Sequence, residues 1–172
     1  MKIIILYGLI VFFFTSCQPK EITRYTNSSP EVNKVQELVK DYNEGNWESW
    51  LSHYADTAIV RHNTIAPSTP LEIQQGLQNN LQPLSKYGFS DEAMFCEMII
   101  DDKGQKWVNF WGTWEGTMAA TGEELVIPIH LTLQFVNGKI VLEQGYYDLS
   151  KYLAAIEKLE NQKPGKKATV KN

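Results

Sequence analysis

An acidic residue near the end of the chain is the side chain best suited to chemistry. Asp148 closes an alternating segment, residues 139–148, and lies at the far end of a sheet face that is apolar up to that end. Desolvation there would raise the pKa of its carboxyl group, which suits a general base near neutral pH. The same aspartate immediately precedes Leu149-Ser150-Lys151-Tyr152, where an Asp caps a helix well. Both roles stay open, and the capping role is favoured.

Tyrosine and histidine side chains are the candidates for assisting that carboxylate. Tyr54 and Tyr146 can donate hydrogen bonds to a substrate oxygen. Each can equally be a residue of the cavity wall whose hydroxyl is hydrated, and the sequence does not distinguish the two. His62 lies on a β-like segment, residues 58–63, and can approach a pocket from it. A partly buried histidine that is hydrogen-bonded within the protein and has no catalytic role is more common. The catalytic candidates are therefore Asp148, Tyr146 and His62.

Other chemical signatures are missing from the sequence. There is no Cys-x-x-Cys pair, and His53, which is expected to be exposed, is in a different predicted element from His62. No metal site and no cofactor are therefore expected. Neither a glycine-rich phosphate loop nor a nucleophile elbow occurs. With 16 basic and 20 acidic residues, the net charge of −4 argues against a nucleic-acid partner.

The first residues have the pattern of an export signal. Lys2 precedes an apolar run, residues 3–14, which is shorter than the about 20 residues that span a bilayer. Phe14-Thr15-Ser16-Cys17 then resembles a bacterial lipobox. The resemblance implies removal of residues 1–16, acylation of Cys17 and anchoring to a membrane of the cell envelope, facing the periplasm or the cell surface.

Composition divides the remaining chain into three parts. Residues 17–29 are polar and are expected to form the lipidated cysteine and its tether. Residues 30–160 have the periodicity of one domain. Residues 161–172 carry several lysines with Pro164 and Gly165, and a disordered basic tail is expected there.

Helical signals dominate the first half of the domain. Ser29-Pro30 opens a helix that Gly45 ends, and Asn46 can cap a second, short one. Thr69-Pro70-Leu71-Glu72 is a capping box that begins a third helix, which runs until Pro83.

After Phe89 the hydrophobic period changes to two, which predicts four strands over residues 89–101, 105–118, 124–136 and 139–148. Gly104 and the pair Asn137-Gly138 are hairpin signals. A last helix is expected over residues 149–160. Helices followed by an antiparallel meander indicate an α+β fold, with about three N-terminal helices and a short C-terminal helix on a curved antiparallel sheet.

This order of elements resembles the NTF2-like fold, a cone, and within it the SnoaL-like group, over about residues 31–156. The motifs that carry the resemblance are Trp50-x-x-x-Tyr54-Ala55-Asp56-x-Ala58, Trp111-Gly112-Thr113-Trp114, and Phe135-Val136-Asn137-Gly138-Lys139-Ile140-Val141 followed by Tyr146-Tyr147-Asp148. In SnoaL-like enzymes a pocket carboxylate abstracts a proton next to a carbonyl, so the resemblance permits that role for Asp148. The fold hosts isomerases, cyclases, dehydratases and many non-enzymes, so it does not fix an activity.

The hairpin registers sort side chains onto two faces of the sheet. A two-residue loop at Asn137-Gly138 places Tyr146 and Asp148 toward the helices and Glu143 outward, although a bulge would reverse part of this assignment. The expected cavity lining is Trp47, Trp50, Tyr54, Phe110, Trp114 and Leu131.

The outer face of the sheet is expected to carry aromatic side chains. Phe95, Trp107 and Trp111 fall on it, which is too much apolar area to leave in water. In the NTF2-like fold this face commonly forms a homodimer, so a homodimer is predicted.

Three functions remain open. The favoured one is a membrane-tethered domain that binds a small, largely apolar molecule in a cone-shaped cavity. The second is an isomerase, cyclase or dehydratase with Asp148 as general base. The third is an envelope module whose outer sheet face binds another protein.

Overall fold

The structure, a computed structural model, describes residues 23–162. The predicted signal peptide, Cys17 and all but the first two residues of the predicted tail lie outside the described residues. The fold is mixed α+β, as predicted from the sequence. The elements in chain order are β1 (Tyr25–Thr26), α2 (Pro30–Glu44), α3 (Trp47–Ser52), β2 (Tyr54–His62), α4 (Pro70–Leu81), β3 (Leu84–Phe89), a 3-10 turn (Asp91–Ala93), β4 (Phe95–Ile100), β5 (Lys106–Met118), β6 (Glu124–Val136), β7 (Lys139–Tyr147) and α5 (Ser150–Gln162).

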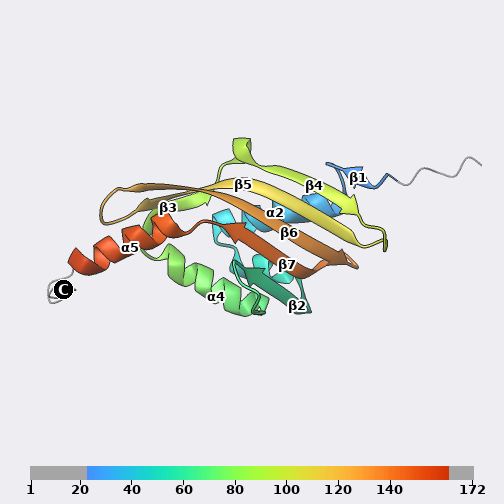
Figure 1. Cartoon of the computed structure of the whole chain (residues 1–172), viewed down its shortest axis with the longest axis horizontal. Helices are drawn as coiled ribbons and strands as arrows, with labels where there is room; N and C mark the ends of the chain where they lie inside the picture. Colours follow the sequence, from blue (N-terminus) through green and yellow to red (C-terminus); the bar gives the residue numbers. More distant parts are fainter. Residues whose placement is uncertain (1–22, 163–172) are drawn as a thin grey trace, which may run out of the picture.

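One curved sheet organises the domain. Its strands run in the order β1-β4-β5-β6-β7-β2, and β3 pairs with β5. All these pairings are antiparallel except that of β2 with β7, which is parallel. Figure 1 shows α2 behind β5 and β6, and α4 beside β2. Among the described residues, no helix is both long enough and apolar enough to cross a membrane.

The helix ends are fixed by local side chains. The Ser29 hydroxyl accepts from the backbone N–H of Val32 at 3.1 Å, and Gly45 ends α2 in the left-handed region at φ 70°. At α4, the backbone N–H of Glu72 donates to Thr69 Oγ1 at 3.2 Å, while the Glu72 carboxylate accepts from the Thr69 N–H at 2.7 Å. These caps confirm the starts predicted for the first and third helices.

Helix α3 begins after Asn46 as predicted, but Asn46 does not cap it through its side chain. The Asn46 side chain donates instead to the carboxylate of Glu44, at 2.8 Å.

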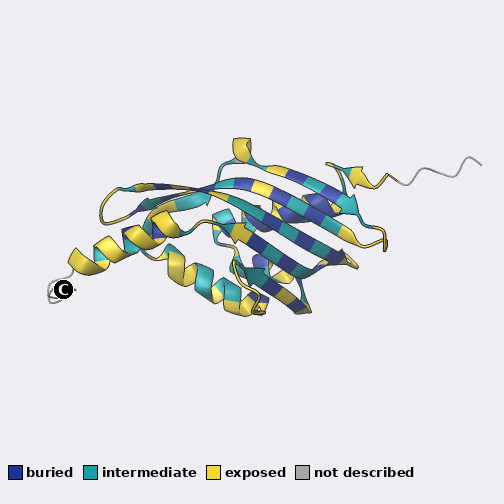
Figure 2. Cartoon of the chain, viewed as in Figure 1, coloured by how far each residue is buried: buried dark blue, intermediate teal, exposed yellow. Residues whose placement is uncertain are grey.

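Strand β5 builds the inward face of the sheet from alternating large rings and glycines. Phe110 is fully buried and Trp114 is 6% exposed, as the register predicted. A Cβ on Gly112 would lie 2.4 Å from the ring of Phe110, and one on Gly116 would lie 2.4 Å from the ring of Trp114. Each ring therefore lies over the glycine that follows it on the same face. Figure 2 shows the alternation of burial along the strands.

The hairpin at Asn137-Gly138 forms as predicted, with both residues at positive φ, 51° and 74°. The strand after it departs from the predicted register. Phe135 is opposite Ile140, but Gln134 is opposite Leu142, so Val141 is an extra, bulged residue. Beyond it the inward and outward positions of β7 are exchanged.

Three element boundaries also differ from the prediction. Residues 84–89 form β3, a strand for which the sequence analysis made no prediction. Tyr25 and Thr26, placed in the tether by composition, pair with Ile99 and Met98 of β4. The last helix continues to Gln162, two residues beyond the predicted domain.

Candidate functional site

A cavity of about 130 Å³ lies between the helices and the inward face of the sheet. Side chains from α2, α3, α4 and α5 line it on one side, and side chains from β2, β3, β5, β6 and β7 line it on the other. The lining is largely aliphatic and aromatic. Its one carboxylate is Glu143, on β7.

Glu143 is the center of a buried polar cluster. Its side chain is 2% exposed, yet both carboxylate oxygens have donors. The hydroxyl of Tyr54 donates to Oε2 at 2.6 Å. Nε2 of His62 lies 2.7 Å from Oε1, and donates to it because a carboxylate only accepts. We call Glu143, His62 and Tyr54 the Glu143 cluster. It meets the requirement that a buried charge be hydrogen-bonded.

The parallel pairing of β2 with β7 assembles this cluster. Val60 is opposite Glu143 and His62 is opposite Gly145. A Cβ on Gly145 would lie 2.6 Å from Cδ2 of His62, so only a glycine leaves room for the imidazole at that place. The Asn63 side chain then holds the two strands together, because it donates to the carbonyl of Tyr147 and accepts from its N–H, at 2.8 and 3.0 Å.

The electrostatics keep the tyrosines of the site protonated. Burial, and then the negative charge of Glu143, raise the pKa of Tyr54 well above its usual 10.0. The same two causes raise the pKa of Tyr147 to about 12. Tyr54 is therefore a hydrogen-bond donor at any physiological pH.

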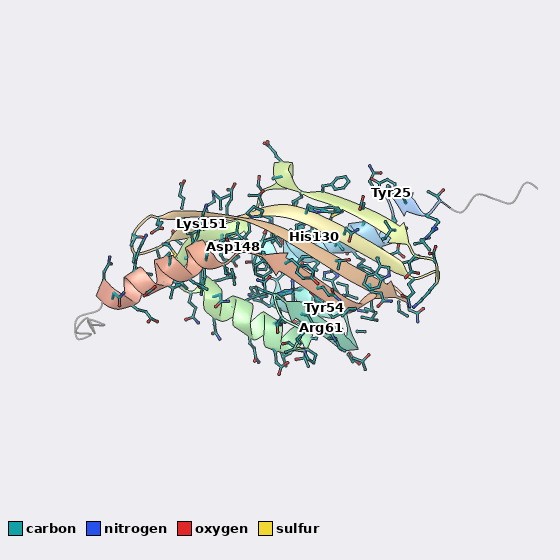
Figure 3. All side chains as sticks on the ribbon, in the orientation of Figure 1. Tyr25, Tyr54, Arg61, His130, Asp148 and Lys151 are labelled. Carbon is teal, nitrogen blue, oxygen red and sulfur yellow. The ribbon has the colours of Figure 1, made fainter. Side chains whose placement is uncertain are left out.

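Asp148 and Tyr146 do not line the cavity, which corrects the inward placement predicted for them. Asp148 is exposed, and its carboxylate accepts from the backbone N–H and the hydroxyl of Ser150 at 2.8 and 3.0 Å. These bonds lower the pKa of Asp148. It bonds the first residue of α5, and it lies well apart from Tyr54 in Figure 3. Tyr146 is 56% exposed, because the Val141 bulge turns it outward.

The other sequence-predicted site residues divide into two groups. His62, Trp50, Tyr54, Trp114 and Leu131 line the cavity.

Phe110 and Trp47 are not part of the lining. Phe110 is buried behind Phe89, with ring centroids 5.2 Å apart. Trp47 packs on Tyr42 at 5.8 Å. His53, expected to be exposed, is 6% exposed and bonded to Asp41 at 2.7 Å.

Glu143 is the site residue that sequence reasoning missed. An uninterrupted hairpin register places it on the outer face. The available signal was the run Ile140-Val141-Leu142, where three apolar residues in succession break the alternation of a half-buried strand. No group of three or more potential metal ligands lies together within residues 23–162.

Comparison with known families identifies the class of the protein. The SnoaL-like domain family matches residues 35–143, more than half of the chain. The chain therefore belongs to the SnoaL-like domain family. Among curated proteins, none matches the chain.

Solved structures show the same fold at low identity. A candidate polyketide cyclase from Xanthomonas campestris pv. campestris is 18% identical, with a TM-score of 0.60, and the match covers 75% of this chain and 98% of that one. AclR, a candidate hydroxylase from Streptomyces galilaeus, is 13% identical at a TM-score of 0.60, covering 74% and 96%. A protein with a ketosteroid isomerase-like fold from Catenulispora acidiphila, solved with trimethylamine, is 15% identical at 0.56, covering 70% and 89%.

The raised pKa of Tyr54 predicts a loss of stability at high pH. Above pH 10 this phenol ionises in the unfolded chain while it stays protonated in the folded one. The free energy of unfolding therefore falls as the pH rises above 10, by about 1.4 kcal/mol per pH unit for this group. Tyr54→Phe removes that contribution. In urea unfolding, the free energy of unfolding of this variant should fall less steeply above pH 10, by about 1.4 kcal/mol per pH unit.

Tyr146→Phe, which removes an exposed hydroxyl from the same sheet, is the matched control for that measurement. A Tyr54→Phe profile parallel to the profiles of the wild type and of this control would contradict the assignment.

Proposed function

We propose that the domain binds a small, largely apolar molecule in the cavity above β7. The observation that carries this proposal is a cavity of about 130 Å³ with largely apolar walls, into which the buried Glu143 cluster faces. An apolar cavity of about 150 Å³ is large enough to bind benzene. Apolar walls with a few fixed polar groups are typical of small-molecule sites.

Toluene is a probe of suitable size for this proposal. Leu77 lines the cavity from α4, so Leu77→Trp should fill it and weaken toluene binding at least about tenfold, measured by an NMR shift titration. Leu71→Trp, on the half-exposed side of the same helix, is the control and should bind as the wild type does. Equal affinities of the two variants would contradict binding in this cavity.

The Glu143 cluster favours a second candidate function, acid–base catalysis. His62 lines the cavity and uses Nε2 for Glu143. Within residues 23–162 the other ring nitrogen, Nδ1, has no hydrogen-bond partner. In a common arrangement for a general base, a carboxylate orients an imidazole through one ring nitrogen, and the other ring nitrogen accepts the proton. A proton taken from a carbon next to a carbonyl would pass to Nδ1, with Glu143 stabilising the imidazolium. This is the chemistry of an isomerase, cyclase or dehydratase.

Hydrogen–deuterium exchange of cyclohexanone tests this second function without knowledge of the natural substrate. The protein should accelerate exchange next to the carbonyl beyond the buffer rate, measured by NMR. Glu143→Gln should lose about 10²-fold or more of that acceleration. Asp148→Asn should keep it, since Asp148 bonds Ser150 at the start of α5 and does not line the cavity. Acceleration that depends on Asp148 and not on Glu143 would restore the assignment made from the sequence alone.

We further propose that this domain is exported and tethered to a membrane of the cell envelope through a lipid on Cys17. The support is the sequence of residues 2–17, in which a basic residue, a short apolar run and small residues precede the cysteine. Stable anchoring needs more than one acyl chain, as bacterial lipoproteins carry.

Cys17→Ser tests the tether in the bacterial host. The wild-type protein should incorporate radiolabelled palmitate and sediment with membranes, and the variant should do neither. Cys96→Ser, which removes the buried second cysteine, is the control that should keep both properties. Unlabelled wild-type protein would contradict lipidation.

The homodimer also remains a proposal. Phe95 and Trp111 on the outer sheet face are 46% and 39% exposed, with their rings 5.6 Å apart. Apolar area of this kind is typical of an interface. Sedimentation at varied concentration distinguishes a dimer from a monomer, and a monomer at all concentrations would favour an envelope module whose outer face binds another protein.

A further inference from the structure

The cavity contains one fixed negative charge and no fixed positive charge. Among the described residues that line it, Glu143 is the only acidic one and none is a lysine or an arginine. Tyr54 and Tyr147 face the same space with raised pKa values, so they add no charge. His62 is the only lining side chain that can become positive.

Both carboxylate oxygens of Glu143 are occupied by hydrogen-bond donors. Tyr54 donates to Oε2, and Nε2 of His62 lies 2.7 Å from Oε1. Because Tyr54 donates as a neutral phenol, it occupies Oε2 without cancelling the negative charge. In a buried, weakly polarisable setting such a charge is felt across the cavity. The site is thus biased against anions and toward a positive ligand.

The aromatic side chains in the cavity walls also attract cations. Aromatic rings lie on several sides of the space: those of Tyr42, Trp50, Phe89, Trp114, Tyr147 and Tyr152, in addition to Tyr54. Aromatic rings attract cations through their quadrupole, and the attraction is larger where water is excluded. Aromatic surroundings with a nearby carboxylate are the usual means of holding an alkylated ammonium group.

We propose that the ligand is a small alkylammonium ion, and that Glu143 and the aromatic walls together select it. This inference rests on the proposed binding function of the same cavity. The volume of about 130 Å³ limits the ligand to a few carbon atoms around the nitrogen. A tertiary or quaternary ammonium fits best, because both oxygens of Glu143 already accept hydrogen bonds from Tyr54 and His62. A cation with few or no N–H groups needs no further acceptor.

Choline and 3,3-dimethylbutan-1-ol test the proposal, because they have the same shape and differ in one atom, a charged nitrogen or a neutral carbon. Both have as many non-hydrogen atoms as toluene. In an NMR titration of the domain, choline should bind at least about tenfold more tightly than the neutral alcohol. Choline binding that is equal to or weaker than that of the alcohol would overturn the proposal.

Glu143→Gln separates charge from shape in the same titration. The amide can accept from Tyr54 through its oxygen and donate to His62 in the other imidazole tautomer, so the hydrogen bonds of the cluster can be kept. Choline affinity should fall about tenfold or more, and affinity for the alcohol should stay within twofold. Glu115→Gln makes the same change at an exposed position of β5 and should leave both affinities unchanged.

Toluene distinguishes the failure of this inference from the failure of the proposed function. Toluene binding with no preference for choline leaves a binding cavity that does not select cations. If toluene, choline and the alcohol all fail to bind, both proposals are overturned. The wild-type comparison of choline with the alcohol needs no variant, so it stands even if Glu143→Gln does not fold.

Discussion

The burial of one carboxylate constrains much of this structure. Glu143 is 2% exposed, and a charge so placed must be hydrogen-bonded or the fold loses several kcal/mol. Its two donors, Tyr54 and His62, come from the two ends of β2, which lies parallel to β7 with a shift of register between Tyr54 and Ile59. The bulge at Val141 turns the carboxylate inward, and Gly145 leaves room for the imidazole.

Most of the fold was predictable from the sequence because its signals are local. The serine and threonine caps, the positive-φ glycines and the Asn137-Gly138 turn act over a few residues, and each formed where it was expected. The alternation on β5 also gave the correct inward face, since a strand without a bulge has only two possible assignments. Phe110 and Trp114 are buried for that reason.

The site was less predictable because it depends on one extra residue and one non-local pairing. A bulge at Val141 exchanges the faces of β7, so Glu143 and Tyr146 were each assigned to the wrong face. The parallel contact of β2 with β7 joins segments about eighty residues apart in the chain, and no turn signal reports it. His62 lines the cavity that the sequence analysis expected it to approach, but its partner was identified only by the structure.

The pairing of β1 with β4 has a consequence for where the domain can work. Tyr25 pairs with Ile99 at the edge of the sheet. Only the stretch from Cys17 to Tyr25 can therefore link a lipid on Cys17 to the folded domain. Fully extended, that stretch reaches about 29 Å at most. With a lipid on Cys17, as proposed, the near edge of the sheet would stay within this distance of the bilayer surface. Such a protein samples molecules that partition at the lipid–water boundary, where small amphiphilic compounds accumulate, instead of those dissolved in the bulk compartment.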